Sequence, residues 1–151
     1  MTVSREQVAT AIFKSLTTIA SVQWVTKSRI LKMWTDVQPD QRPALFLVEH
    51  HESYARQNEK LRKRTLEFNI FIYLNTKPTD QYVSGGAQLN FILDQIDAAL
   101  APSGIDVLNS RDTNTLGGLV QHCYIDGQII KVPGDLEGDG LLVIPVKVLM
   151  P

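Results

Sequence analysis

Residues 65–75, with the sequence TLEFNIFIYLN, form the longest run in the chain that alternates with a period of two. One set of alternate positions is entirely apolar and points to one side of a strand: Leu66, Phe68, Ile70, Ile72 and Leu74. Burying each such side chain contributes roughly 1.5 to 3 kcal/mol, so together they rival the net stability of a whole domain. We therefore expect this segment to be the central strand of a sheet.

The second face of this strand is less uniform. It begins with polar residues, but Phe71 and Tyr73 follow Glu67 and Asn69 along it. Two aromatic side chains near one end of the strand favour a contact on both sides of the sheet at that end. Another subunit is one candidate for that contact.

The remaining elements are predicted from shorter patterns. A capping box of Ser4 and Gln7 begins a first helix, whose apolar residues recur every three or four positions as far as Ile19. A second helix is expected over residues 88–101, and a Pro-Ser-Gly sequence ends it. Residues 28–34 fit either a strand or a helical turn. Strands are expected over residues 22–27, 44–54, 120–132 and 141–150.

Two features limit how the last strands can pair. Pro145 has no backbone N–H, which favours an edge or bulged position for residues 141–150. Asp126 and Gly127 mark a tight turn or a bulge in the strand before it. Residues 55–64 are polar and outnumber the two to five residues of an ordinary hairpin connection, so we interpret them as a long loop.

The order of elements is helix, three strands, helix, two strands. This order predicts an α+β fold with a mainly antiparallel, mixed sheet of four to five strands and two helices packed on one of its faces. No internal repeat or linker divides the chain. We therefore expect a single domain over residues 1–151.

Composition excludes some classes of function. The formal net charge of −1 gives no overall attraction to nucleic acid or membranes, which argues against DNA binding by the molecule as a whole. No window approaches the length of about 18 apolar residues that a membrane-spanning helix needs. The single cysteine, Cys123, excludes an internal disulfide and a cysteine-based zinc cage. Because the first residues lack the apolar core of a signal peptide, we expect the protein to remain in the cytosol.

The strongest metal-like pattern lies in an acidic segment near the last strand. Asp135, Glu137 and Asp139 occupy the first, third and fifth positions of a calcium loop, with Gly140 at the sixth. The twelfth position of such a loop requires a bidentate glutamate, and this chain has Val146 there. We therefore interpret the segment as a flexible acidic loop and expect no bound metal or cofactor.

The other candidate ligands and nucleophiles are His50, His51, His122 and Cys123. Adjacent residues on a strand point to opposite faces, so at most two or three of these side chains could converge on zinc, and His122 cannot activate Cys123. The chain also lacks a Gly-x-Ser-x-Gly elbow, a phosphate-binding glycine loop and a His-Glu-x-x-His motif. We expect no enzyme activity. Two alternatives remain open: a small metal-dependent hydrolase using these residues or the acidic loop, and a generic cytosolic binding module with an open sheet edge.

One dense basic cluster lies in the polar segment between the second and third predicted strands. It could meet phosphates or an acidic protein surface, or it could be a solvated loop. Glu52 and Glu59 dilute its charge, so we favour a protein interface over nucleic acid. The cluster consists of Arg56, Lys60, Arg62, Lys63 and Arg64.

Taken in this order, the elements resemble the tail terminator proteins of long-tailed bacteriophages, the family of the lambda minor tail protein U. The resemblance covers most of the chain. It comprises an amphipathic first helix, a Pro-Ala-Leu-Phe-Leu-Val strand opening, a long polar loop, the alternating LEFNIFIYL strand, a helix after a proline-containing turn, and a terminal hairpin. The chain departs from the small members of this family in residues 24–43 and 134–140.

The resemblance implies a small α+β subunit that assembles into a ring, typically a hexamer, on the head-proximal end of the tail tube. Such a ring stops polymerisation of the tail tube protein, joins the tail to a head-completion or connector protein, and lets DNA pass through its channel. It would be assembled in the cytoplasm of the bacterial host and reside in the virion tail, with no membrane partner. We expect the basic cluster to contact neighbouring subunits or the tube, with Asp135, Glu137 and Asp139 as acidic counterparts.

Overall fold

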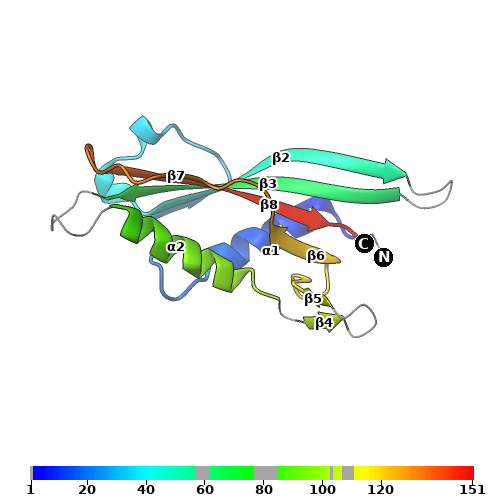
Figure 1. Ribbon diagram of the computed structural model, residues 1–151. Helices are drawn as coiled ribbons and strands as arrows, with labels where there is room; N and C mark the ends of the chain where they lie inside the picture. The colour runs from blue at the N-terminus through cyan, green and yellow to red at the C-terminus, as the bar shows by residue number, and fades with distance from the viewer. Residues whose placement is uncertain (1, 57–61, 77–84, 103, 107–110) are drawn as a thin grey trace.

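The structure is a computed structural model that describes residues 2–56, 62–76, 85–102, 104–106 and 111–151. Its helices are α1 (Arg5–Thr17), η1 (Trp34–Asp36), η2 (Pro39–Gln41) and α2 (Gly85–Ala99), where η marks a short 3₁₀ helix (Figure 1). Its strands are β1 (Thr26–Ser28), β2 (Ala44–Arg56), β3 (Arg62–Asn75), β4 (Gly104–Asp106), β5 (Arg111–Thr113), β6 (His122–Ile125), β7 (Ile130–Val132) and β8 (Asp139–Leu149).

Six of these strands form one mixed sheet in the order β1-β2-β3-β8-β6, with β7 also paired to β8. β1 is parallel to β2, and the other pairs of this sheet are antiparallel. The α+β class and the mainly antiparallel, mixed sheet are confirmed. The described sheet has six strands rather than four or five because residues 120–132 supply two short strands in place of one long one.

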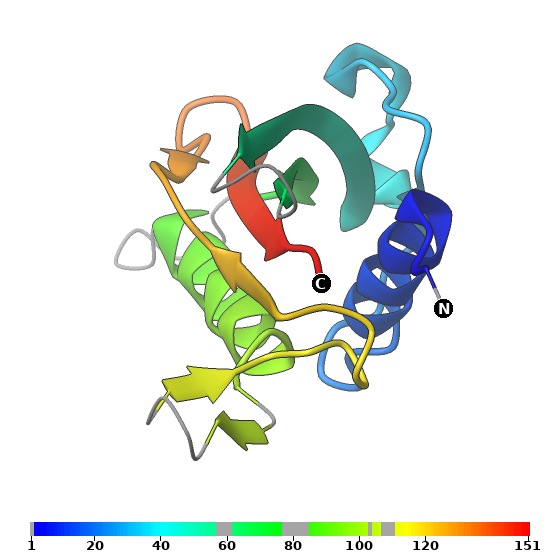
Figure 2. The ribbon, with the colours of Figure 1, turned by 90° about the vertical axis from the view of Figure 1, so that its right-hand side faces the viewer.

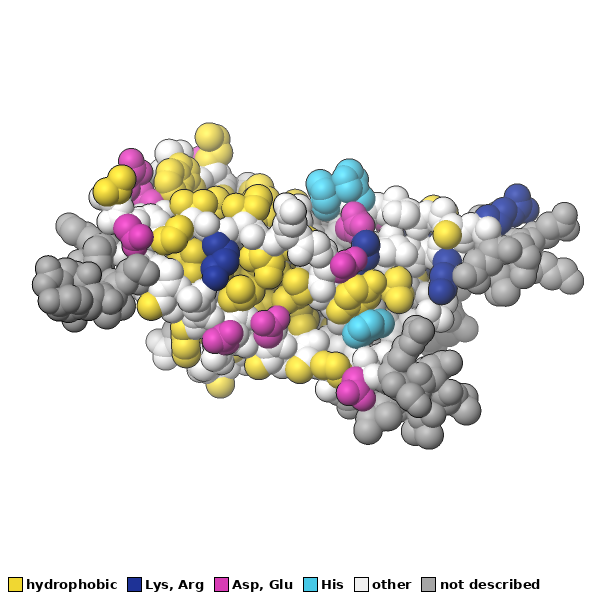
Figure 3. All heavy atoms as spheres, viewed as in Figure 1, with side chains coloured by type: hydrophobic (Ala, Val, Ile, Leu, Met, Phe, Trp, Pro, Cys, Tyr) yellow, Lys and Arg dark blue, Asp and Glu magenta, His cyan; other side chains and the backbone are white. Residues whose placement is uncertain are grey.

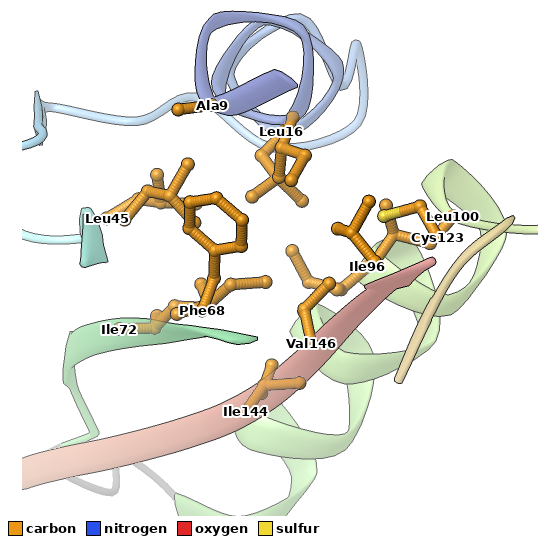
Figure 4. Close-up of a cluster of buried hydrophobic side chains, with 14 of the residues drawn as sticks. Ala9, Leu16, Leu45, Phe68, Ile72, Ile96, Leu100, Cys123, Ile144 and Val146 are labelled. Atoms are coloured by element: carbon orange, nitrogen blue, oxygen red, sulfur yellow. The ribbon is translucent and has the colours of Figure 1, made fainter. Parts of the chain in front are cut away.

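β3 lies between β2 and β8, which confirms the central position predicted from residues 65–75. Its apolar set is buried, with Ile70 and Ile72 fully inaccessible to solvent. Both helices cover this face of the sheet, as predicted (Figure 2). Figure 4 shows side chains from the helices and the sheet meeting in one core. The helices contribute Val8, Ile12 and Leu16 from α1, and Leu89, Ile92 and Ile96 from α2.

α1 begins at the predicted capping box. The Gln7 backbone N–H donates to Ser4 Oγ at 3.1 Å, and the Ser4 backbone N–H donates to Gln7 Oε1 at 2.8 Å. The helix ends at Thr17, two residues before Ile19, the last apolar residue of the predicted pattern. α2 begins at Gly85, three residues earlier than predicted, and only glycine fits there because an added Cβ would lie 2.2 Å from the Pro133 carbonyl oxygen.

β8 is an interior strand of the sheet, so of the two positions expected for Pro145, edge or bulged, the edge is wrong. β8 pairs with β3 along one side and with β6 and β7 along the other. The Pro145 carbonyl accepts a hydrogen bond from the Asp126 N–H at 3.2 Å, which places the proline backbone opposite the connection between β6 and β7. No ladder N–H is needed at that break, so proline is tolerated. Gly127, with φ of 121°, lies beside the proline ring there.

Residues 55, 56 and 62–64 belong to strands, so the long polar loop expected over residues 55–64 is wrong at both of its ends. β2 continues to Arg56 and β3 begins at Arg62, directly opposite it. Residues 57–61, which lie outside the described residues, join the two strands. The sequence missed this extension because neither side of the hairpin is buried here, so no alternation of polar and apolar residues marks it.

The second face of β3 is partly covered by the chain itself. Tyr73 belongs to a small apolar cluster with Val37, Ala44 and Phe46, and the ring centroids of Phe46 and Tyr73 lie 5.3 Å apart. The contact expected on both sides of the sheet is therefore supplied in part by residues 34–46 of the same chain. No helix among the described residues is long and apolar enough to cross a membrane.

Candidate assembly surfaces

The β2–β3 hairpin projects from the body of the molecule as an arm (Figure 1). Every residue of β2 from Glu49 to Arg56 is exposed. The pairing of β3 with β8 stops at Thr65 and Leu149, so the hairpin beyond that point has two strands. A two-stranded hairpin without a buried face is marginally stable by itself.

The predicted basic cluster lies at the end of this arm. Arg56 and Arg62 are opposite each other in the hairpin, and Lys63 and Arg64 follow on β3. Lys63 is exposed and Arg64 is half-buried. Lys60 lies outside the described residues. Within the described part of the chain, no ion pair neutralises Arg56, Lys63 or Arg64.

The base of the arm is held by the first residue of α1. The Arg5 guanidinium forms an ion pair with Glu52, and its Nη2 donates to the Tyr54 hydroxyl at 2.9 Å. The hydrogen bond from Arg5 is the largest cause of a lowered pKa for the Glu52 carboxyl. These contacts tie the base of the arm to α1.

The three predicted acidic residues do not form one cluster. Asp139 is paired with the buried guanidinium of Arg42 at 2.5 Å, and Asp135 accepts a hydrogen bond from the Gly85 N–H at 2.7 Å. Glu137 is exposed. Asp139 is opposite Asn75, at the far end of β3 from the arm, so about 35 to 40 Å of strand separates the acidic loop from the basic end. Contact between these groups therefore requires two copies of the chain.

The histidines and the cysteine lie on two different strands, His50 and His51 on β2 and His122 and Cys123 on β6. A β-bulge at His50 places the rings of His50 and His51 3.8 Å apart, so the expectation that these neighbours point to opposite faces is wrong. His122 Nδ1 accepts a hydrogen bond from the Asn114 N–H at 3.1 Å. Burial raises the pKa of the Cys123 thiol to about 12, so the nucleophilic thiolate is disfavoured. The described residues contain no group of three or more His, Cys, Asp or Glu side chains able to hold a metal ion.

An open apolar groove of about 470 Å³ lies on the face of the sheet opposite the helices. Phe71 and Leu141 belong to the sheet at this groove, and Tyr73 fixes one wall because its hydroxyl donates to the Lys32 carbonyl at 2.6 Å. Hydrophobic side chains gather over the half of the molecule that carries β7 (Figure 3). The sequence hinted at this surface through Phe71 and Tyr73. The other lining residues include Leu31, Met33 and Val132.

Leu136, in the loop between β7 and β8, is 100% exposed. Its loop is tightly closed, because the Gly138 N–H donates to the Gly134 carbonyl at 2.7 Å and the Gly138 carbonyl accepts from the Thr76 N–H at 2.8 Å. The leucine is therefore presented by an ordered turn. In the sequence, the neighbouring carboxylates form a recognisable pattern, whereas nothing marks this leucine as exposed.

Comparison with known proteins identifies the fold. The structure matches a chain from the virion of a native gene transfer agent particle with a TM-score of 0.52, covering 94% of this chain and 92% of that one. The two chains share a fold. Their sequences are 7% identical, so the likeness concerns the arrangement of elements alone. No protein-family model and no curated protein matches the sequence.

Proposed function

We propose that this protein is a structural subunit of a phage-like virion and that it acts as a tail terminator. The observation that carries the proposal is the fold match to a virion chain, which extends over nearly the full length of both chains. The order of elements that resembles tail terminators supports the same role from the sequence. The single-domain organisation over residues 1–151 is part of the proposal.

In this role the subunits form a ring, of six copies in the typical case, on the last ring of the tail tube. One face of the ring is complementary to the tube protein. The opposite face differs from the surface that a tube ring presents, so the next tube ring cannot bind there. The free face receives a head-completion or connector protein, and DNA passes through the central channel. The work is done by shape and charge, without a chemical step. Assembly takes place in the host cytoplasm, and the ring then remains in the virion.

The arm supports this proposal because it offers charge without an internal partner. Arg56, Lys63 and Arg64 project with the hairpin, away from the core that both helices cover. We assign Arg56, Lys60, Arg62, Lys63 and Arg64 to contacts with the tube protein or a neighbouring subunit. Of the acidic group, Glu137 is exposed, whereas Asp135 and Asp139 already have partners within the chain.

The experiment is light scattering of the purified protein across a range of concentrations, combined with electron microscopy. We expect rings, and we expect the K63E/R64E variant to remain folded while forming rings poorly. The K14E/K27E variant is a matched control because it makes the same change in charge on exposed lysines away from the arm. Unaltered rings in K63E/R64E would remove the assignment of the arm. A wild-type protein that stays monomeric at high concentration and turns over a substrate would refute the function.

A further inference from the structure

We infer that Leu136 of one copy seats in the apolar groove of a second copy, and that this contact links the subunits. The inference rests on the proposed self-assembly and supplies its interface. Two features of the described surface favour an apolar partner. Leu136 is fully exposed, and the apolar groove is open to solvent. Both are formed in the isolated subunit, so little ordering entropy opposes their contact.

The leucine is held as a rigid projection. Gly134 has φ of 69° and Gly138 has φ of 80°, values that side chains rarely adopt, and an added Cβ at Gly134 would lie 2.3 Å from the Asp139 carbonyl oxygen. Asp135 anchors the loop by accepting the Gly85 N–H at 2.7 Å. A tight turn fixed at both ends has no means of folding Leu136 back onto its own core.

The groove is suited to such a projection. Its volume of about 470 Å³ accommodates a leucine and part of the turn that carries it, and the residues that line it are apolar except for Lys32. Met33 forms part of one wall and is itself 70% exposed, which leaves an apolar edge for the incoming loop. Residues 31–34, which line the groove, are held against the sheet by the hydrogen bond from the Tyr73 hydroxyl to the Lys32 carbonyl.

Charge favours a second copy as the occupant. Asp135 and Glu137 flank Leu136 and both residues are exposed, so the loop carries negative charge beside the leucine, although one Asp135 oxygen accepts the Gly85 N–H. Lys32 is the charged residue that lines the groove, and its sign is opposite. The groove therefore attracts this loop and disfavours an apolar segment flanked by lysine or arginine.

The contact is also of the right kind for a ring. Leucine and groove are different patches of one subunit, so a copy that receives a leucine still has its own to offer. Such a heterologous contact continues from copy to copy until it closes. The basic arm lies at the other end of β3 and stays available for the tube protein.

The experiment uses two variants that disable opposite halves of the contact. L136D removes the projection and keeps the groove, while M33D places a carboxylate in the groove and keeps the projection. Both sites are highly exposed, so both variants should fold, which circular dichroism verifies. F91D is the matched control, because Phe91 is 49% exposed on α2 and does not line the groove.

Measured by light scattering and analytical ultracentrifugation, L136D and M33D should each self-associate at least about 10-fold more weakly than the wild type, and F91D should match it. An equimolar mixture of L136D and M33D should form a dimer and grow no further, since one leucine and one groove remain. Rings of wild-type stability in L136D would overturn this inference while leaving the proposed function intact. No dimer in the mixture would overturn it as well. Absence of rings in the wild type would instead count against the proposed function.

Discussion

Arg42 and Asp139 form an ion pair of 2.5 Å between residues that are 97 positions apart in the sequence. The Arg42 side chain is 4% exposed, and it also donates to the carbonyls of Val37 at 2.8 Å and Trp34 at 3.3 Å. One guanidinium therefore ties the segment that forms the groove wall to the first residue of β8. The shape of the groove depends on this pair.

The first prediction concerns this pair. The D139N variant should lower the free energy of unfolding by about 2 kcal/mol, because it leaves a buried guanidinium without its counter-charge. Urea denaturation monitored by fluorescence measures the change. D94N serves as the control, since Asp94 is exposed on α2 and should give a change within about 0.5 kcal/mol. Equal effects of the two substitutions would show that the pair has no special role.

The second prediction tests the core. F68A should destabilise the protein by about 3 to 5 kcal/mol, because Phe68 is buried beneath the helices and its removal leaves a cavity. F91A removes the same side chain from an exposed position of α2 and should cost about 1 kcal/mol or less. Thermal and urea unfolding of both variants provide the comparison. A similar cost at the two sites would contradict the placement of the core.

The third prediction concerns the turn that carries Leu136. G134A combines a left-handed backbone with a clash against the Asp139 backbone, so it should cost about 2 kcal/mol or more. G117A has a similar φ of 74° but open space around the new Cβ, so it should cost about 1 kcal/mol. The difference between the urea unfolding midpoints of G134A and G117A measures the cost of the steric clash between the new Cβ and the Asp139 backbone. G134A should also weaken self-association, because the turn no longer holds its shape.

The fourth prediction concerns Cys123. Its pKa is raised from 9.0 to about 12 by burial, so the folded state favours the neutral thiol. The resulting contribution to stability is complete below pH 9 and is lost as the pH rises toward 12. The thiol should therefore resist alkylation by iodoacetamide at pH 8 and react readily in urea. Rapid labelling of the native protein would contradict the buried position.

The sequence predicted the centre of this fold well because burial there is one-sided and periodic. Phe68 and Ile70 lie on the predicted face of β3, and Ser4 caps α1 as its spacing indicates. The backbone geometry of the hairpin was missed for the opposite reason. Where both faces of a strand are exposed to solvent, as at Arg56, the backbone hydrogen bonds form without requiring any alternation of polar and apolar side chains.

The candidate site was harder to predict because its parts come from distant segments. The acidic residues form a group in the sequence, but Asp139 pairs with Arg42 in the structure. No local sequence pattern indicates a partner that lies 97 positions away. Pro145 predicted an edge or a bulged position because the interior of a strand normally needs every N–H. At the break between β6 and β7 no carbonyl waits for an N–H from residue 145, so proline fits there. The sequence of β8 alone contains no sign of this break.

The interior position of β8 has a consequence for the order in which the molecule can be made. β6 and β7 are synthesised before β8, yet both reach the sheet only through it. Until residues 139–149 have left the ribosome, β3 has one bare edge and the two short strands have no place in the sheet. The nascent chain should therefore complete its sheet in a single late step. The apolar groove forms in the same step, because Leu141 of β8 lines it.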